Sequence, residues 1–506
     1  MTRGVKVVLA LGIGVALCLG PVVVGFLSGS VSSADAADQV ESAIVLEPCQ
    51  LSAPGSPVRV PAKCGTLTVY EDREAQAGRR IDLRVAVVKA VRGNPAPDPL
   101  FLLTGGPGQA ATQSYLSLAP ALDRIREKRD IVLVDQRGTG QSNPLQCAQL
   151  WDLDEQTGTS GAGIQSVLKA CLDGLDADSR LYTTPIAMDD LDQVRQALGY
   201  QKVNLYGVSY GTRAALSYLR QYPDRVRTVI LDGVWPLGLS LSPMAAANAQ
   251  RAIDMMFDRC AVDAACADAF PNLRAEFADL LNRLKQGPAR VELNHPITAE
   301  PMEFDFTYEQ FASGVRLLTY SPETEALLPM LIHGAYSTGD FRLLAAQSLM
   351  VGEQLSDSIS LGMGYSVMCA EDLPFSSRED SEAAVDGSYL GTVVADALFE
   401  ACAVWPRGAV SGDFNSPVDS DTPVLMLSGE ADPVTPPSNA EFAARTLPRS
   451  LHLVAPGQGH NVLFRGCLSR VAASFVESGT TEGLDTGCVR EIVPMPFFAN
   501  PAGPPP

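Results

Sequence analysis

The segment Gly207-Val208-Ser209-Tyr210-Gly211 is the feature that most constrains what this chain folds into. A short buried strand is predicted just before it, at residues 203–206, and a helix just after it, at residues 210–222. A serine on such a sharp strand-to-helix turn has strained backbone angles, and there is no room for a side chain two positions before or after it. Both of those positions are glycine. The segment therefore predicts a nucleophilic serine, Ser209. The alternative is a surface glycine loop, because this pattern also arises by chance, but the flanking strand and helix favour the turn.

The rest of the chain alternates between predicted strands and helices, which is typical of a mostly parallel sheet. Between about residues 240 and 415 the pattern changes to helical stretches with charged faces. We therefore expect an α/β fold in which one sheet is split by a large, mainly helical cap. Strands are predicted at residues 83–90, 100–103, 131–134, 203–206, 226–231, 424–427 and 451–454, and helices at 186–198, 210–222, after 437 and at 462–475.

The length of 506 residues exceeds what one hydrophobic core usually supports, which agrees with a core that carries a substantial insertion. Five segments are expected. They are a signal peptide (residues 1–36), the first part of the core (37–239), the cap (240–415), the second part of the core (416–490) and a flexible proline-rich tail (491–506).

The N-terminal segment has the pattern of an export signal. Arg3 and Lys6 precede an apolar run at residues 7–27, and Ala34-Asp35-Ala36 resembles a signal-peptidase site. The apolar run is longer than a usual signal core, so an uncleaved membrane anchor is the alternative. We expect a secreted or periplasmic protein that contacts a membrane only if this segment is retained.

Of the 11 cysteines, all but Cys18 lie outside the predicted signal peptide, and an even set of ten in an exported chain indicates disulfides. A zinc site would need short paired spacings, which this set lacks. Connectivity does not follow from sequence, and the simplest prediction pairs each cysteine with its neighbour. The predicted pairs are Cys49 with Cys64, Cys147 with Cys171, Cys260 with Cys266, Cys369 with Cys402, and Cys467 with Cys488.

The charge of the chain limits its partners. Lysine and arginine total 38 against 58 acidic residues, which gives a net charge of −20. A surface of this charge repels phosphate backbones and anionic lipid. We therefore expect no nucleic-acid partner.

A serine hydroxyl becomes a good nucleophile when a neighbouring base removes its proton and a carboxylate orients that base. In the strand-turn-helix arrangement predicted here, the acid and then the histidine follow the serine along the chain. His460 lies just beyond a predicted strand, where a loop presents its imidazole, whereas His295 and His333 fall in the cap. Asp432 lies further past the preceding strand than Glu430 does. We predict His460 as the base and Asp432 as the acid, with Glu430 as the fallback.

The negative oxygen that forms during the attack needs two backbone N–H donors. One is predicted to come from Tyr210, directly after the serine, and the other from Gly105 or Gly106, after an early strand. A phosphate-binding loop is the rival interpretation, but Pro107 removes an N–H, and no dinucleotide-binding or P-loop motif is present. This chemistry needs no metal and no organic cofactor.

Four motifs together make the chain resemble one branch of the α/β-hydrolases, the prolyl iminopeptidases and tripeptidyl aminopeptidases. The resemblance covers most of the predicted mature chain and implies an α/β-hydrolase fold with Ser209, Asp432 and His460 as its triad. It also implies an exopeptidase that cleaves peptides from a free N-terminus. The motifs are Gly105-Gly106-Pro107-Gly108, Asp135-Gln136-Arg137-Gly138-Thr139-Gly140-Gln141-Ser142, Asn204-Leu205-Tyr206-Gly207-Val208-Ser209-Tyr210-Gly211-Thr212 and Asp432-Pro433-Val434-Thr435-Pro436.

The chain departs from the narrower prolyl iminopeptidase pattern at Thr104, where that group usually has histidine. The long cap and the paired cysteines look more like the secreted tripeptidyl aminopeptidase-like members. Release of proline and release of tripeptides therefore both stay open.

A free amino terminus is a cation, and a partly dry cleft recognises it with a carboxylate. In the enzymes that this chain resembles, acidic residues of the cap have this role. Glu371 and Asp372 are the candidates, because a disulfide at Cys369 would fix the backbone beside them. The alternative is a solvated acidic pair on the cap surface.

Two further functions remain open at this stage. A secreted carboxylic ester or lactone hydrolase would use the same triad on a different bond. An inactive hydrolase fold that serves as an extracellular binding protein would keep the fold without the chemistry.

Overall fold

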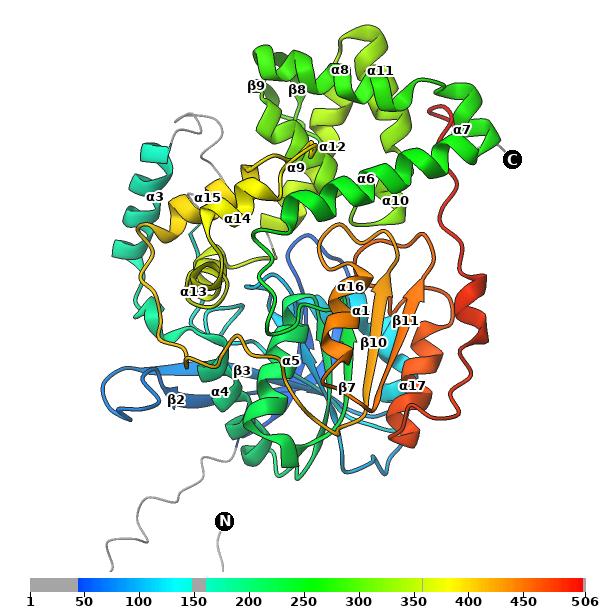
Figure 1. The fold of residues 1–506 in the computed structure, drawn as a ribbon. Coiled ribbons are helices and arrows are strands. Elements are labelled where there is room, and N and C mark those ends of the chain that lie inside the picture. The colour runs from blue at the N-terminus through cyan, green and yellow to red at the C-terminus, as the bar shows by residue number, and fades with distance from the viewer. Residues whose placement is uncertain (1–43, 148–160, 357, 504–506) are drawn as a thin grey trace, which may run out of the picture. The chain divides into compact units, whose positions relative to one another are not determined.

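A nine-stranded sheet forms the framework of the computed structural model, which describes residues 44–147, 161–356 and 358–503 (Figure 1). The predicted signal peptide lies outside these residues. In the order in which they pair, the strands are β1 (Glu47–Leu51), β2 (Val60–Tyr70), β3 (Arg80–Val88), β5 (Ile131–Val134), β4 (Leu100–Leu103), β6 (Val203–Val208), β7 (Val226–Asp232), β10 (Val424–Gly429) and β11 (Ser450–Ala455). The strands from β5 to β11 pair in parallel, and β1, β2 and β3 extend the sheet in antiparallel pairing.

The seven predicted strands are confirmed, with ends shifted by a few residues. β4 and β5 are buried along their whole length, as expected of parallel strands that are covered on both faces. Leu103 is paired with Gly207, and Val208 is paired with Asp232. The carboxyl ends of β4, β6 and β7 therefore lie at the same edge of the sheet, which is where ligands bind in open α/β folds.

Helices cover both faces of the sheet because successive apolar residues of each strand point to opposite sides. Phe101 and Leu103 belong to the core on one face, and Leu100 and Leu102 to the core on the other. The helices α4 (Thr184–Ala197), α5 (Tyr210–Gln221) and α16 (Pro437–Ala444) contribute to the first core, and α1 (Ala111–Arg126) and α17 (Leu468–Ser478) to the second.

One predicted helix boundary is wrong. A helix was expected at residues 462–475, but α17 begins at Leu468. The N–H groups of Val462 and Leu463 donate instead to the carboxylate of Asp232 (2.8 and 3.0 Å), which holds this segment as a loop.

The cap lies between β7 and β10 and has a hydrophobic core of its own. Figure 1 shows most of its helices, coloured green to yellow, above the sheet. A two-stranded hairpin, β8 (Ala289–Asn294) with β9 (Pro301–Phe306), was not anticipated. None of the helices in the described ranges has the length and hydropathy needed to cross a membrane. The cap helices are α6 (Ala245–Val262), α7 (Ala264–Ala269), α8 (Leu273–Gln286), α9 (Tyr308–Leu318), α10 (Pro322–Glu325), α11 (Leu328–Thr338), α12 (Arg342–Ser356), α13 (Leu361–Glu371), α14 (Arg378–Ala383) and α15 (Val393–Cys402).

All five predicted disulfides are confirmed. Two of them, Cys147–Cys171 and Cys369–Cys402, belong to one hydrophobic cluster with Trp405. This cluster joins α3 (Gly161–Gly174) to α13 and α15. A helix from the first part of the chain therefore packs with the helices of the cap.

The segment after residue 490, which was predicted to be a flexible tail, packs against the rest of the protein at its described residues. Gln458 donates to the carbonyl of Val493 (3.1 Å), and the N–H of Phe498 donates to the carbonyl of Ala326 in the cap (3.0 Å). Between them, Phe497 is only 3% exposed in the core of the cap. The burial of this ring holds the segment in place. The prolines on either side of Phe497 do not prevent the ring from packing.

Truncation of this buried ring should destabilise the protein. Phe497→Ala is expected to lower the free energy of unfolding by about 3 kcal/mol, because it removes a buried aromatic ring and leaves a cavity. Val493→Ala is the control, since Val493 is 76% exposed, and should change that free energy by less than about 0.5 kcal/mol. Urea denaturation measures both values, and equal effects would contradict the packed segment.

Candidate active site

Ser209 stands alone between two regular elements. β6 ends at Val208 and α5 begins at Tyr210, and Ser209 has a φ of +55°, in a region that L-residues rarely adopt. The Ser209 N–H donates to the carbonyl of Asp232 (2.9 Å), and the hydroxyl of Thr212 donates to the carbonyl of Ser209 (2.6 Å). These bonds on both sides of the residue maintain the strained turn.

The two flanking glycines are required by close backbone contacts. A Cβ atom on Gly207 would overlap the carbonyl of Gly211, and a Cβ atom on Gly211 would overlap the carbonyl of Leu103 at the end of β4. The turn that carries Ser209 is therefore packed directly against the neighbouring strand end.

Gly211→Ala should disrupt this turn. The added methyl group meets backbone, so the helix start must shift, and we expect kcat/KM to fall by about 100-fold or more because Ser209 is displaced. The control is Gly174→Ala in α3, where a Cβ atom would meet nothing within 4 Å. Steady-state kinetics with thermal denaturation distinguish the two, and full activity of Gly211→Ala would contradict the packed turn.

The predicted oxyanion donors lie next to Ser209. Tyr210 is the first residue of α5, where the N–H has no partner within the helix. A Cβ atom on Gly105 would be 3.2 Å from the Cβ of Ser209, so the loop after β4 lies directly against the predicted nucleophile. Gly106 follows with a φ of +104°, a conformation that favours glycine. The roles of these N–H groups stay predictions.

The structure brings together the predicted acid and base. Nδ1 of His460 is 2.8 Å from the carboxylate of Asp432, and the side chains are 6% and 0% exposed. Because an ionised carboxylate only accepts hydrogen bonds, Nδ1 donates and Nε2 is left to accept a proton. The fallback acid, Glu430, is exposed and accepts the N–H of Gly457 instead (2.8 Å).

Asp432 remains ionised although it is buried. Burial favours its neutral form, but the charge and hydrogen bond of His460 and the N–H groups of Thr435 and Val434 outweigh burial and lower the pKa of Asp432. The N–H distances are 2.9 and 2.8 Å. A charged Asp432 suits the stabilisation of a positive imidazolium.

Thr435 is a residue of the site that the sequence did not single out. Its hydroxyl donates to Asp432 (2.8 Å) and lies 3.1 Å from Nδ1 of His460. The available signal was its position in the Asp432 motif, three residues after the acid.

The carboxyl end of β7 connects the two halves of the site. The carbonyl of Asp232 holds the Ser209 N–H, and a Cβ atom on the next residue, Gly233, would be 3.1 Å from Cε1 of His460. The nucleophile backbone and the imidazole therefore contact two consecutive residues, Asp232 at the end of β7 and Gly233 just after it.

Glu371 and Asp372, the predicted substrate ligands, are fully buried. Glu371 accepts the N–H and the hydroxyl of Thr184 (2.5 and 2.7 Å), and that hydroxyl is 2.7 Å from the hydroxyl of Tyr210. Asp372 accepts the N–H groups of residues 241 and 242, where the chain enters the cap. Both carboxylates take part in internal hydrogen bonds, so this geometry gives no support to their contact with substrate.

Burial raises the pKa of Glu371 to about 7, although the charge of Arg213 and the hydrogen bonds from Thr184 oppose the shift. A carboxyl whose folded pKa is raised stabilises the fold below its unfolded pKa, and this contribution is lost as the pH rises through the folded pKa.

Glu371→Gln should remove this pH dependence, because glutamine imitates the neutral acid. From about pH 5 to 8, the free energy of unfolding of the wild type should fall relative to that of the variant. Urea denaturation across this range measures the difference. Glu379→Gln, at an exposed glutamate, should keep the wild-type dependence, and parallel curves for wild type and Glu371→Gln would contradict the raised pKa.

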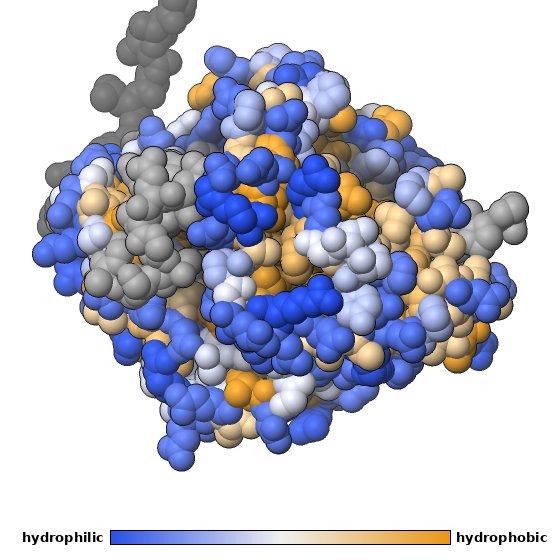
Figure 2. Space-filling view, turned by 90° about the horizontal axis from the view of Figure 1, so that it is seen from above, coloured by the Kyte–Doolittle hydropathy of each residue, from blue (hydrophilic) through white to orange (hydrophobic). Residues whose placement is uncertain are grey.

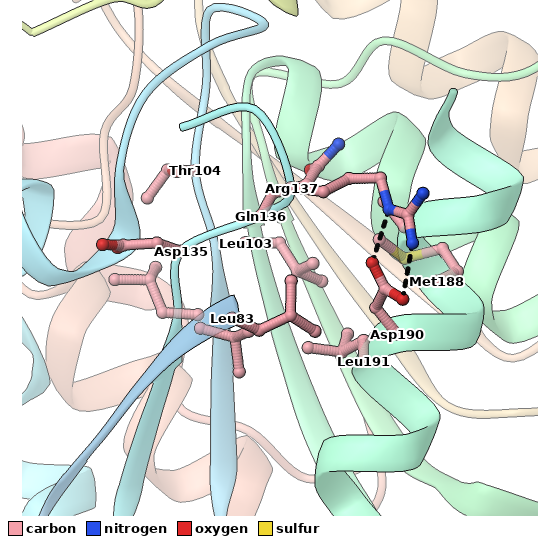
Figure 3. A pocket seen from close by; sticks show the side chains of 12 residues that line it. Leu83, Leu103, Thr104, Asp135, Gln136, Arg137, Met188, Asp190 and Leu191 are labelled. Carbon is pink, nitrogen blue, oxygen red and sulfur yellow. Dashed lines mark hydrogen bonds and ion pairs between the residues drawn. The ribbon is translucent and has the colours of Figure 1, made fainter. Parts of the chain in front are cut away.

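A small cavity lies beside the site, between the loops after β4 and β5 and helix α4 (Figure 3). Arg137 and Asp190 form an ion pair at its side (2.6 Å), and Thr104 and Gln136 also line it. It leaves about 20 Å³ for the centres of water molecules, which suits a single water and is too small for a peptide.

In the described ranges, no group of three or more His, Cys, Asp or Glu residues is arranged to hold a metal ion.

Two families match this chain. Residues 98–324 match the family described as the alpha/beta hydrolase fold, and residues 387–488 match the TAP-like proteins. The chain has an α/β-hydrolase fold with a TAP-like C-terminal region. The first match contains Ser209, and the second contains Asp432 and His460. The family resemblance that the four motifs predicted is confirmed.

Three relatives are similar to this chain over most of its length. Serine protease Hip1 of Mycobacterium tuberculosis strain H37Rv is 27% identical over 478 residues, or 87% of this chain and 90% of that protein. Carboxylesterase B of the same strain is 27% identical over 475 residues, or 84% and 86%. Tripeptidyl aminopeptidase of Streptomyces coelicolor is 24% identical over 475 residues, or 86% and 84%. With the fold, these relatives identify the chain as a serine hydrolase.

Proposed function

We propose that this α/β hydrolase is an exported serine aminopeptidase in which Ser209, His460 and Asp432 form the triad. One observation carries the proposal: a buried Asp432 holds His460 at 2.8 Å, and the imidazole lies against the end of β7, which also accepts the N–H of the strained Ser209. This arrangement matches the demands of acyl transfer, in which a base activates a serine and an acid orients the base.

The reaction proceeds in two halves. Nε2 of His460 takes the proton of Ser209 as the hydroxyl attacks the peptide carbonyl, and the N–H groups of Tyr210 and of Gly105 or Gly106 stabilise the oxyanion. The imidazolium, held by Asp432, then gives the proton to the leaving amine. Water, activated by the same base, hydrolyses the acyl-enzyme and releases the N-terminal fragment.

The proposed substrate is a peptide with a free N-terminus. The product released from that end is proline or a tripeptide. The relatives named as a tripeptidyl aminopeptidase and a serine protease support a peptide bond as the target. Figure 2 shows hydrophobic surface at the hollowed centre of the upper face, within a rim of hydrophilic residues. Such a surface suits peptide side chains, and the net charge of −20 favours a cationic amine.

Export is supported by the five disulfides, because disulfides form and persist in oxidising compartments. The predicted N-terminal signal peptide supports the same location. We propose a secreted or periplasmic enzyme, which contacts a membrane only if that segment is retained.

The second candidate is a carboxylic ester hydrolase. The observation that favours an ester substrate is the similarity to Carboxylesterase B, which is 27% identical, as Hip1 is. The same triad opens either bond, so the substrate decides between the two functions.

A substrate panel tests the proposal. Aminoacyl, dipeptidyl and tripeptidyl chromogenic substrates should be cleaved when the amine is free. N-terminal acetylation should lower kcat/KM by at least about 100-fold, because it removes the cationic amine that the proposed enzyme recognises. Faster turnover of acetylated peptides or simple esters would overturn the aminopeptidase and favour the esterase.

A fluorophosphonate should label the wild type and spare Ser209→Ala. Absence of labelling of the folded wild type would indicate a binding protein.

A further inference from the structure

We infer that two cap residues, Arg251 and Tyr320, are positioning residues that hold the Asp432 and His460 loops in catalytic geometry. The inference rests on the proposed function, because it assigns a role relative to the proposed acid and base. It extends that function by making the cap part of the catalytic machinery as well as a cover over it.

Arg251 connects the cap to the acid loop. From α6, its guanidinium donates to the carbonyl of Glu430 (2.7 Å) and to the carbonyl of Asp432 itself (2.8 Å). One turn earlier on the same helix, the amide of Asn248 donates to the carbonyl of Val434 (3.1 Å). Helix α6 therefore holds the backbone on both sides of the proposed acid.

Tyr320 connects the cap to the base loop. The N–H of His460 donates to the carbonyl of Tyr320 (2.7 Å), and the two rings meet edge to face with centroids 5.3 Å apart. A Cβ atom on Gly459 would overlap the same carbonyl, so the cap segment lies directly on the backbone beside the histidine. The ion pair between Arg465 and Glu323 (2.7 Å) joins the same two segments at the surface.

The Tyr320 carbonyl is itself held in a defined position between α9 and α10. The hydroxyl of Thr319 donates to the carbonyl of Arg316 (2.7 Å), and that of Thr324 donates to the carbonyl of Leu318 (2.6 Å). Ser321 caps α10 by accepting the N–H of Thr324. These local bonds make the connection a rigid support for His460.

The core alone does not supply these contacts. Asp232 holds the N–H groups of Val462 and Leu463, after the histidine, and Asp432 holds the imidazole. The N–H of His460 and the carbonyl of Asp432 bond to the cap. A shift of the cap would therefore move acid and base together relative to Ser209, and misplacement by about 1 Å costs on the order of 100-fold in rate.

Four variants and two matched controls test this inference. Arg251→Met removes both donors and keeps the apolar stem, whereas Arg251→Lys restores one donor. Tyr320→Ala removes the ring, whereas Tyr320→Phe keeps it. The controls are Arg283→Met and Tyr336→Ala, since Arg283 and Tyr336 are an arginine-tyrosine pair elsewhere on the cap.

The rate of labelling by a small fluorophosphonate is the main readout, because it reports activation of Ser209 without peptide binding. Arg251→Met and Tyr320→Ala should each label at least about 10-fold more slowly than wild type, with kcat falling more than KM rises. Arg251→Lys should recover part of the rate and Tyr320→Phe most of it. Both controls should label like wild type.

His460→Ala separates the two levels of the proposal. If His460→Ala labels like wild type, the proposed triad is wrong. If His460→Ala is not labelled while Arg251→Met and Tyr320→Ala label like wild type, only the positioning role is overturned. Thermal denaturation checks folding. If an alanine or methionine variant fails to fold, the labelling rate of Arg251→Lys decides the question: a rate below that of both controls supports the positioning role, and a rate equal to theirs overturns it.

Discussion

Asp232 is the residue on which the geometry of the site depends. Its carbonyl accepts the N–H of Ser209, and its carboxylate accepts the N–H groups of Val462 and Leu463. One residue at the end of β7 therefore anchors the nucleophile turn and the loop that carries His460, although these lie about 250 residues apart in the chain. Burial raises the pKa of Asp232 to about 6, against the opposing N–H bonds from both loop residues and the hydroxyl of Tyr206. Those donors explain how a carboxyl group is accommodated so deep in the core.

The cap is connected to the chemistry at several separate points. Glu371 on α13 bonds to Thr184, whose hydroxyl contacts Tyr210 next to the nucleophile. Arg251 holds the carbonyl of Asp432, and Tyr320 holds the N–H of His460. The C-terminal segment also runs from the core to the cap. The proposed acid and base therefore each contact a cap residue, and Tyr210, next to the nucleophile, is connected to the cap through Thr184. The cap thus supports the site.

The core of the fold could be predicted well from the sequence, because the features that specify its strands and turns lie within short segments of the chain. Buried strands such as 100–103 and 131–134 are short apolar runs, and glycines at 207 and 211 mark a turn that admits no side chain. The disulfides were predictable because each cysteine pairs with its neighbour. The start of α17 and the packing of the segment after residue 490 were not predicted, because each depends on a partner distant in sequence, Asp232 in one case and the core of the cap in the other.

The sequence by itself determined the α/β-hydrolase fold, the strained position of Ser209 and the order in which acid and histidine follow it. These properties depend on backbone conformation and on the periodicity of apolar residues, which neighbouring residues specify. Only the tertiary structure decided that Asp432 rather than Glu430 contacts His460, that Thr435 joins them, and that Glu371 lies in an internal network. The physical reason is that hydrogen-bond partners, burial and pKa depend on distances between side chains, and those distances exist only once the sheet and cap have packed together.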